Sequence, residues 1–150
     1  MKKLFLVIFC LATVNIFAQK LSLNESTNFY EFSKIVEVND NQLNEKFKKR
    51  FKEINLENIQ YDNTTLTGNG FTNHLVGGFA TVEIKYKVKI ELKEHKYKLT
   101  LTNFILKDKN GSNPIEGMKS FKNKWINIID KKLPSIVENI EKINLNSDKW

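Results

Sequence analysis

The chain has 150 residues, which suits a single domain. Charged residues make up 27% of it and hydrophobic residues 41%, the balance of a folded soluble protein, which excludes a compositionally biased or disordered chain. The formal net charge is +7, a basic excess that weakly favours acidic partners and selects none.

The first residues have the pattern of a secretory signal. Lys2 and Lys3 form a short basic region, and residues 4–14 form an apolar core that is too short to span a bilayer. Ala18 supplies the small residue at the cleavage point. We therefore predict a signal peptide over residues 1–18, a mature chain that starts at Gln19, and an exported protein of the periplasm or the extracellular space. A buried N-terminal strand and an uncleaved anchor are the alternatives.

Cys10 is the only cysteine, and it lies inside this apolar core. A lipoprotein needs a small residue just before its cysteine, and Phe9 is large, so we expect no lipidation. Cleavage would leave a mature chain without disulfides or thiol chemistry. It would also remove two lysines, so that 22 basic residues face 17 acidic ones and the net charge falls from +7 to +5.

The first half of the mature chain predicts a polar lead-in, a strand and a helix. Residues 19–28 are polar, and an imperfect alternation of apolar residues over 29–38 indicates a strand. Asn39 and Asp40 stop this strand and offer a helix N-cap. Leu43, Phe47 and Phe51 follow at intervals of four, the spacing of an amphipathic helix. The basic run over residues 48–50 is typical of the solvated face of such a helix, and we prefer this interpretation to nucleic-acid binding.

Two shorter strands follow, over residues 59–62 and 66–73. Gly68 and Gly70 interrupt the second strand. No helix and no Lys-Ser or Lys-Thr pair follows them, so a phosphate-binding loop is not supported. Glycines in a strand more often mark a bulge or a close approach of another group to the backbone.

The stretch from residue 77 to residue 106 predicts one long β-hairpin, and the rest of the chain is organised around it. Gly77 and Gly78 turn the chain into it. Apolar residues stand at every second position of both arms, which is the period of a strand with one buried face. A turn at Glu94-His95 sets the register. That register pairs Leu92 with Tyr97, Ile90 with Leu99, Val88 with Leu101, Ile84 with Ile105, Glu91 with Lys98 and Lys89 with Thr100.

After a loop over residues 108–117, Met118, Phe121, Trp125 and Leu133 follow helical spacing and are expected in the core. Pro134 would end this helix, kink it or begin a new one, because the apolar period continues beyond it. Residues 146–150 form a polar tail. The fold class is therefore α+β. We predict one domain over residues 29–145 in two layers, an antiparallel five-stranded sheet with two helices on one face in the order β-α-β-β-β-β-α.

The chain resembles a family of secreted bacterial domains of unknown function with a TATA-binding-protein-like fold. The residues that carry this resemblance lie at 35–38, 58–62, 68–71, 88–92 and 97–104, together with the helix of Phe47 and Phe51. They cover about two thirds of the chain, up to Leu106. The resemblance implies the fold reached above and no functional residues, because the family has no established activity. Fold alone does not imply DNA binding.

No constellation of side chains points to catalysis, to a metal or to a cofactor. The two histidines, His74 and His95, should lie at opposite ends of the first hairpin strand, too far apart to share a metal ion. Glu83 and Glu91 share a sheet face but stand eight residues apart, about 26 Å at ~3.3 Å per residue, too far to act as a catalytic pair. No nucleophile elbow surrounds any serine. Nothing here argues for an enzyme.

The sheet face turned away from the helices is the candidate contact surface. It carries Lys85, Lys87, Lys89, Lys98, Thr100, Thr102 and Phe104. Our first hypothesis is a non-catalytic envelope module that binds a partner protein or ligand through this face. The second is a polyanion binder, with the lysines on acidic glycans, lipid head groups or, less expected, nucleic acid. The alternative for the lysines is a purely solvated strand face, and an enzyme is the third hypothesis.

Overall fold

The computed structural model describes residues 20–143 of the chain. The predicted signal peptide and the tail over residues 146–150 therefore lie outside the described residues. The elements follow in the order β1 (Ser22–Asn24), β2 (Phe29–Glu37), α1 (Leu43–Glu53), β3 (Glu57–Tyr61), β4 (Thr65–Val76), β5 (Ala80–Lys93), β6 (Lys96–Asp108), β7 (Gly111–Pro114), a short 3₁₀ turn (Ile115–Gly117) and α2 (Lys122–Glu141).

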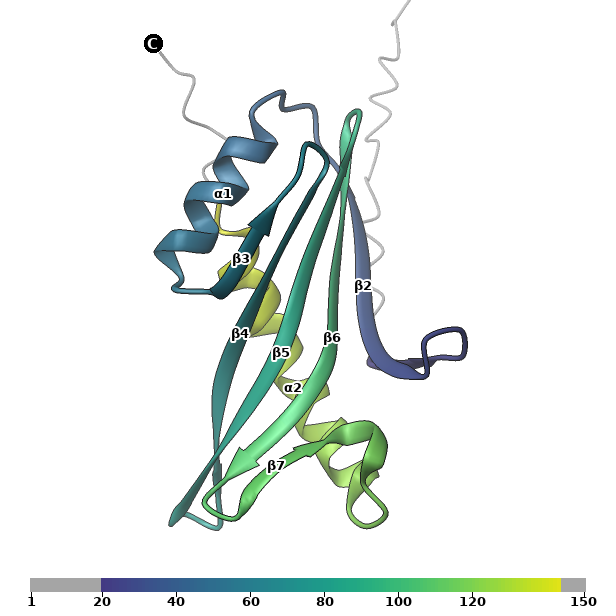
Figure 1. The fold of residues 1–150 in the computed structure, drawn as a ribbon, viewed down its shortest axis with the longest axis vertical. Helices are drawn as coiled ribbons and strands as arrows, with labels where there is room; N and C mark the ends of the chain where they lie inside the picture. The colour runs from purple at the N-terminus through teal and green to yellow at the C-terminus, as the bar shows by residue number, and fades with distance from the viewer. Residues whose placement is uncertain (1–19, 144–150) are drawn as a thin grey trace, which may run out of the picture.

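One antiparallel sheet forms the front layer of the molecule in Figure 1, with α2 crossing behind it and α1 at the upper left beside β3. The strand order is β1-β2-β6-β5-β4-β3, with β7 paired to β6. The α+β, two-layer fold is thus confirmed. Over residues 20–143 the sheet has seven strands where five were predicted, because two short strands join it. One of them, β1, lies in the segment expected to be a loose lead-in, and β7 lies in the predicted loop after β6.

Both helices pack on the same sheet face, and three contacts show this. The Phe47 ring of α1 meets the Tyr97 ring of β6 edge-on at 5.0 Å. The Tyr97 hydroxyl donates a hydrogen bond to Glu141 of α2 at 2.7 Å. Arg50 of α1 donates to the backbone oxygen of Asn139 in α2 at 2.6 and 2.8 Å. A single apolar layer between sheet and helices therefore forms the core, and within residues 20–143 no helix covers the opposite sheet face.

The helices begin and end close to where the apolar spacing placed them. In α1, Leu43, Phe47 and Phe51 are buried as predicted. Asp40, predicted as the N-cap, lies two residues before the actual N-cap Gln42 and accepts the N–H of that residue at 2.8 Å. The α2 helix continues through Pro134 without a break.

Phe121 was expected in the core, and this prediction was wrong. It stands before the first turn of α2 in a left-handed conformation, with φ at 61°, and 73% of its surface is exposed. The helical period therefore starts at residue 122, and Met118 and Phe121 precede it.

The hairpin register is confirmed over the half nearest the Glu94-His95 turn. The pairs of Leu92 with Tyr97, Ile90 with Leu99 and Val88 with Leu101 are all present. The pairing shifts between Lys85 and Lys87, where β6 has one residue more than β5. As a result Ile84 faces Leu106, and the predicted pairing of Ile84 with Ile105 was wrong.

A β-bulge at Asn103 explains this shift. Asn103 has a positive φ of 53°, a left-handed conformation that asparagine tolerates better than most residues. One extra residue in a strand moves every later side chain to the opposite face. Phe104 and Leu106 therefore point into the core, and both are buried.

Candidate functional site

The open face, the sheet surface opposite the helices, carries a row of lysines along β5. Lys85, Lys87 and Lys89 occupy alternate positions, so all three side chains project to this face. Lys98 projects to it from β6, where it pairs with Glu91. The alternation visible in the sequence therefore placed these four lysines correctly.

The neighbours of the lysines follow from the register. Lys89 lies between Thr67 and Thr100, Lys87 between Asn69 and Thr102, and Lys85 between Phe71 and Ile105. Each lysine thus has a short or apolar side chain on the strands to either side. The side chains of Lys85 and Lys89 keep 41% and 42% of their surface exposed.

Two glutamates on the same strand reduce the charge of this row. Glu91 lies 3.0 Å from the ammonium of Lys89, and Glu83 lies 3.5 Å from that of Lys85. Within residues 20–143, neither Lys87 nor Lys98 has a carboxylate within ion-pair distance. The open face is therefore a mixed surface with a moderate basic excess around Lys87 and Lys98.

Two residues of the predicted contact face are not available for contact. Phe104 was expected on the open face, and this was wrong. The bulge at Asn103 turns it inward, where it is fully buried with its ring 6.2 Å from that of Tyr86. Thr100 does lie on the open face, between Lys89 and Ser33, but it is 8% exposed.

An aromatic side chain does lie beside Lys85 on the open face, but it is Phe71 of β4 rather than Phe104 of β6. It stands on β4 directly opposite Lys85, and half of its surface is exposed. Two more exposed apolar side chains, Leu75 and Phe79, follow it toward the tip of the β4–β5 hairpin. The sequence could have indicated this placement. Residues 67, 69 and 71 stand at alternate positions of the strand predicted over residues 66–73, so Phe71 lies on the same sheet face as Thr67 and Asn69. Its exposure depends on the strand order, which the sequence did not show.

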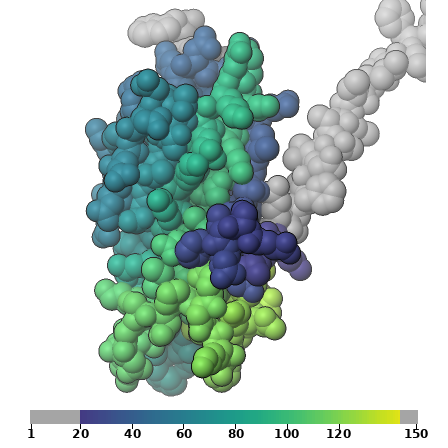
Figure 2. Space-filling view, turned by 45° about the vertical axis from the view of Figure 1, so that its right-hand side comes forward, coloured from purple at the N-terminus to yellow at the C-terminus, as the bar shows by residue number. Residues whose placement is uncertain are grey.

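The β1–β2 hairpin lies on the other side of the sheet from β4, next to β6. Residues 20–30, dark purple in Figure 2, project from the surface beside the central strands. The Glu116 carboxylate accepts the backbone N–H of Tyr30 at 3.0 Å, and Asp130 accepts that of Leu21 at 2.7 Å. These two contacts tie the β1–β2 hairpin to the α2 side of the domain.

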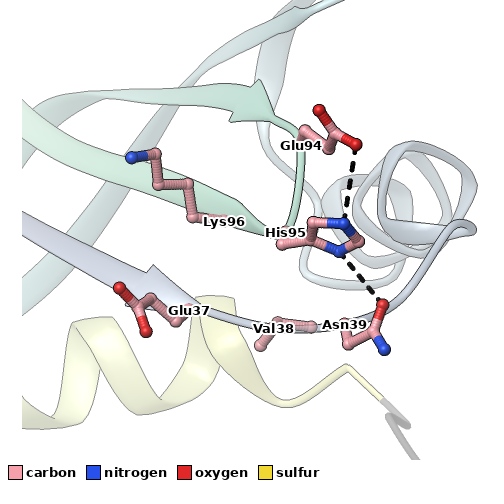
Figure 3. Close-up of a pocket in the computed structure, with 6 residues that line it drawn as sticks. All are labelled: Glu37, Val38, Asn39, Glu94, His95 and Lys96. Carbon is pink, nitrogen blue, oxygen red and sulfur yellow. Dashed lines mark hydrogen bonds and ion pairs between the residues drawn. The ribbon is translucent and has the colours of Figure 1, made fainter.

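A shallow polar hollow lies at the other end of the sheet, where β2 ends beside the β5–β6 turn. Figure 3 shows the residues that line it, Glu37, Val38, Asn39, Glu94, His95 and Lys96. The Nδ1 of His95 lies 3.1 Å from the Asn39 side-chain oxygen, and its Nε2 lies 3.6 Å from Glu94. The backbone N–H of Val38 donates to the His95 carbonyl at 2.9 Å. These contacts fix the turn that sets the hairpin register.

The histidines lie at opposite ends of β5, as predicted. His95 follows its last residue, whereas His74 pairs with Val82 near its start and meets the Trp125 ring edge-on at 6.0 Å. Partial burial, and then the charges of Lys132 and Lys124, lower the pKa of His74. Over residues 20–143, no group of three or more His, Cys, Asp or Glu side chains could hold a metal ion. None of the helices in that range is long and apolar enough to cross a membrane.

The geometry thus defines an α+β domain whose antiparallel sheet is covered on one side by two helices. Two solved structures share this architecture. A TBP-like protein from Parabacteroides distasonis matches with a TM-score of 0.51 and 13% identity, over 77% of this chain and 95% of the other. A DUF4468 family protein from Bacteroides ovatus matches with a TM-score of 0.54 and 10% identity, over 84% of this chain and 92% of the other.

These matches confirm the TBP-like fold that the sequence resemblance implied. Their low identities show the fold alone. No family model and no curated protein matches the chain. The chain is thus a domain of unknown function with a TBP-like fold.

Proposed function

We propose that this protein is an exported, non-catalytic module that binds a partner protein or ligand through the open sheet face. The observation that carries the proposal is the pairing of Phe71 with Lys85 beside an uncovered row of lysines. An exposed aromatic ring next to a flexible cation can anchor a partner by burial while charge orients it. Export is supported by the sequence pattern of residues 1–18.

The mixed charge of the face favours this proposal over simple polyanion binding. Polyanion sites concentrate cations so that several phosphate or sulfate groups are neutralised together. Here Glu83 and Glu91 stand in the same row as the lysines and lie within ion-pair distance of Lys85 and Lys89. A partner with its own mixture of apolar and charged groups fits such a surface better than a uniform polyanion.

Two variants of the open face and one control variant on α2 test the proposal. Lys85→Glu with Lys87→Glu reverses the charge of the row, and Phe71→Ser removes its aromatic neighbour. Lys124→Glu with Lys131→Glu makes the same charge change on exposed positions of α2. All three proteins should fold, because surface substitutions that make few contacts change stability by less than about 0.5 kcal/mol.

Each immobilised protein would be exposed to an envelope extract, and the captured component would be purified and its affinity measured directly. We expect the α2 variant to bind as the unmodified protein does and both face variants to bind at least tenfold more weakly. Equal affinity for all proteins would contradict the proposal. Unfolding of the lysine variant would show that the row packs beneath another part of the chain.

Polyanion binding is the second candidate, and the absence of a nearby carboxylate at Lys87 and Lys98 within residues 20–143 favours it. It predicts binding to vesicles of anionic phospholipid or to polyphosphate that falls steeply as salt is raised, since counterion release dominates such contacts. A partner anchored by Phe71 would lose far less affinity over the same range of salt. The slope of affinity against salt therefore separates the two functions.

A further inference from the structure

The distal half of β4 lies at an edge of the sheet formed by residues 20–143. The register of β3 with β4 ends at Glu57 and Asn69, whereas β4 continues to Val76. Over the described part of the chain, no strand pairs with β4 beyond Asn69 on that side. Figure 1 shows this half of β4 at the border of the sheet, below β3. We call residues 70–76 the open edge.

Two hydrogen bonds show which backbone groups face the open edge. The carbonyl of Thr64 accepts from Leu92 of β5 at 2.7 Å, and the carbonyl of the next residue, Thr65, accepts from Asp62 on the other side at 2.9 Å. Even-numbered residues here thus direct their backbone groups to β5. Because β4 and β5 stay in register without a break from residue 65 to residue 76, this alternation continues. The odd residues Phe71, Asn73 and Leu75 therefore present their N–H and C=O groups to the open edge.

The open edge lacks the features that normally prevent strands from pairing with other chains. Natural edges are protected by short length, charged side chains, proline or bulges. The other strand edges in residues 20–143 have them, since β1 has three residues, β3 has a register shift, β7 contains Pro114, and β2 carries Lys34 and Glu37. From Asn63 to Val82 the chain has no Asp, Glu, Lys or Arg, although such residues make up 27% of the whole sequence.

We infer that the open edge pairs with the open edge of a second copy of this chain, antiparallel and centred on Asn73. In this register Phe71 lies opposite the partner's Leu75, and Asn73 lies opposite the partner's Asn73. These odd-numbered residues have free backbone groups, so each of the three pairs exchanges two hydrogen bonds. The same register places the exposed Phe71 side chain against that of the partner's Leu75 on the open face.

Charge favours a second copy over an unrelated peptide as the occupant. An acidic or basic segment would find no opposite charge along residues 63–82, whereas a second copy of the edge brings no charge that must be matched. The proposed interface between the two open edges uses the same residues of both copies, so the assembly closes at a dimer. This inference goes beyond the proposed function, because it uses the backbone edge of β4 rather than the lysine row of the open face.

The mass of the purified protein, measured by sedimentation over a range of concentrations, tests the inference. We expect a monomer that becomes a dimer as concentration rises into the high micromolar range. Each copy is basic, with a net charge of +7 for the full chain and +5 after cleavage behind Ala18, so raising salt from about 0.05 M to about 0.5 M should strengthen the dimer by screening repulsion. This is the opposite of the trend for an anionic ligand on the lysine row. A protein that stays monomeric at all concentrations would overturn the inference.

Matched variants test whether the open edge forms the dimer interface. Leu75→Lys places a charge on the open edge, and Thr67→Lys places it on the same face of the same strand where Gln60 of β3 covers the edge. Asn73→Pro removes an N–H that faces the open edge, so the fold should keep its melting temperature. We expect Leu75→Lys and Asn73→Pro to weaken the dimer at least tenfold and Thr67→Lys to leave it unchanged. Equal dimerisation of all three variants would contradict pairing through the open edge. If Asn73→Pro does not fold, the comparison of Leu75→Lys with Thr67→Lys tests the inference alone.

A cross-link tests the register itself. Opposed residues in a hydrogen-bonded antiparallel pair have Cα atoms about 5.5 Å apart, within the range of about 4.4–6.8 Å that a disulfide spans. With Cys10 replaced by serine, Asn73→Cys should form a disulfide-linked dimer on mild oxidation, and Thr67→Cys should not. Equal cross-linking of the two variants, or of neither, would contradict pairing centred on Asn73.

Discussion

The Tyr86 ring of β5 lies directly over Gly70, its cross-strand partner on β4. A Cβ atom at position 70 would come within 2.6 Å of the ring. Tyr86 is 7% exposed and packs beside Phe104, so its ring cannot move aside without disturbing the core. The glycine in this strand is therefore required by a close approach, one of the two alternatives that the sequence had left open.

Gly70→Ala should lower the free energy of unfolding by about 1–3 kcal/mol, the usual cost of overpacking a core. A strand glycine that nothing covers would behave in the opposite way, because alanine is then better by about 0.5–1 kcal/mol. Urea denaturation measures the change. In a Tyr86→Leu background the same substitution should cost much less, and an equal cost in both backgrounds would show that the ring is not the cause.

The bulge at Asn103 should tolerate glycine and reject a β-branched residue. Asn103 has a φ of 53°, and a left-handed conformation costs an ordinary residue about 1–2 kcal/mol. We expect Asn103→Val to lose about that much stability and Asn103→Gly to stay within about 1 kcal/mol of the original, both by urea denaturation. Asn69→Val is the control, because it makes the same change at a strand position of β4 where φ is not positive. A larger loss for the control would place the strain elsewhere.

The bulge also marks the limit of what the sequence could predict about the hairpin. From Val88 to Leu101 the alternation is strict and the turn fixes the pairing, so this register followed from sequence alone. Phe104, Ile105 and Leu106 form an unbroken apolar run, so the pattern is compatible with either the even-numbered or the odd-numbered residues facing the core. A one-residue insertion at Asn103 changes no pattern of apolar residues, and it moved Phe104 from the predicted contact face into the core.

The strand order could not be predicted from the sequence, for a different reason. The β2 strand pairs with β6, which lies some sixty residues further along the chain, and this pairing depends on how both pack on the helices. Without the strand order, the alternation assigns the lysines of β5 to one sheet face, but it does not identify which β4 residues lie beside them. The exposure of Phe71 and the open edge of β4 depend on β3 pairing no further along β4 than Asn69.

The export prediction concerns the segment before the described residues. Basic Lys2 and Lys3, the apolar core over residues 4–14 and the small Ala18 should direct cleavage after Ala18. The intact mass of protein expressed in a host with a secretion pathway should therefore match a chain that begins at Gln19. Ala18→Arg should block cleavage and leave the longer form. Soluble protein that still begins at Met1 would contradict this prediction.

Stability should decline above about pH 10, and Tyr97 and Tyr86 are the reason. The Tyr97 hydroxyl donates to Glu141, whose other oxygen lies 2.8 Å from the Lys34 ammonium. Burial, and then the hydrogen bond to Glu141, raises the pKa of Tyr97 far above the ordinary value of 10.0. Burial raises the pKa of Tyr86 to about 12.

In both cases the folded state holds the proton more tightly than the unfolded state does. Their contribution to stability is therefore complete below about pH 10 and is lost as pH rises toward the folded pKa, because the unfolded chain releases its protons first. Each such tyrosine adds about 1.4 kcal/mol per pH unit to the decline. Urea denaturation between about pH 9 and about pH 12 measures this slope. The double variant Tyr86→Phe with Tyr97→Phe should flatten it, whereas Tyr61→Phe, at a side chain that is 40% exposed, should not. A decline that persists unchanged in the double variant would assign it to other groups.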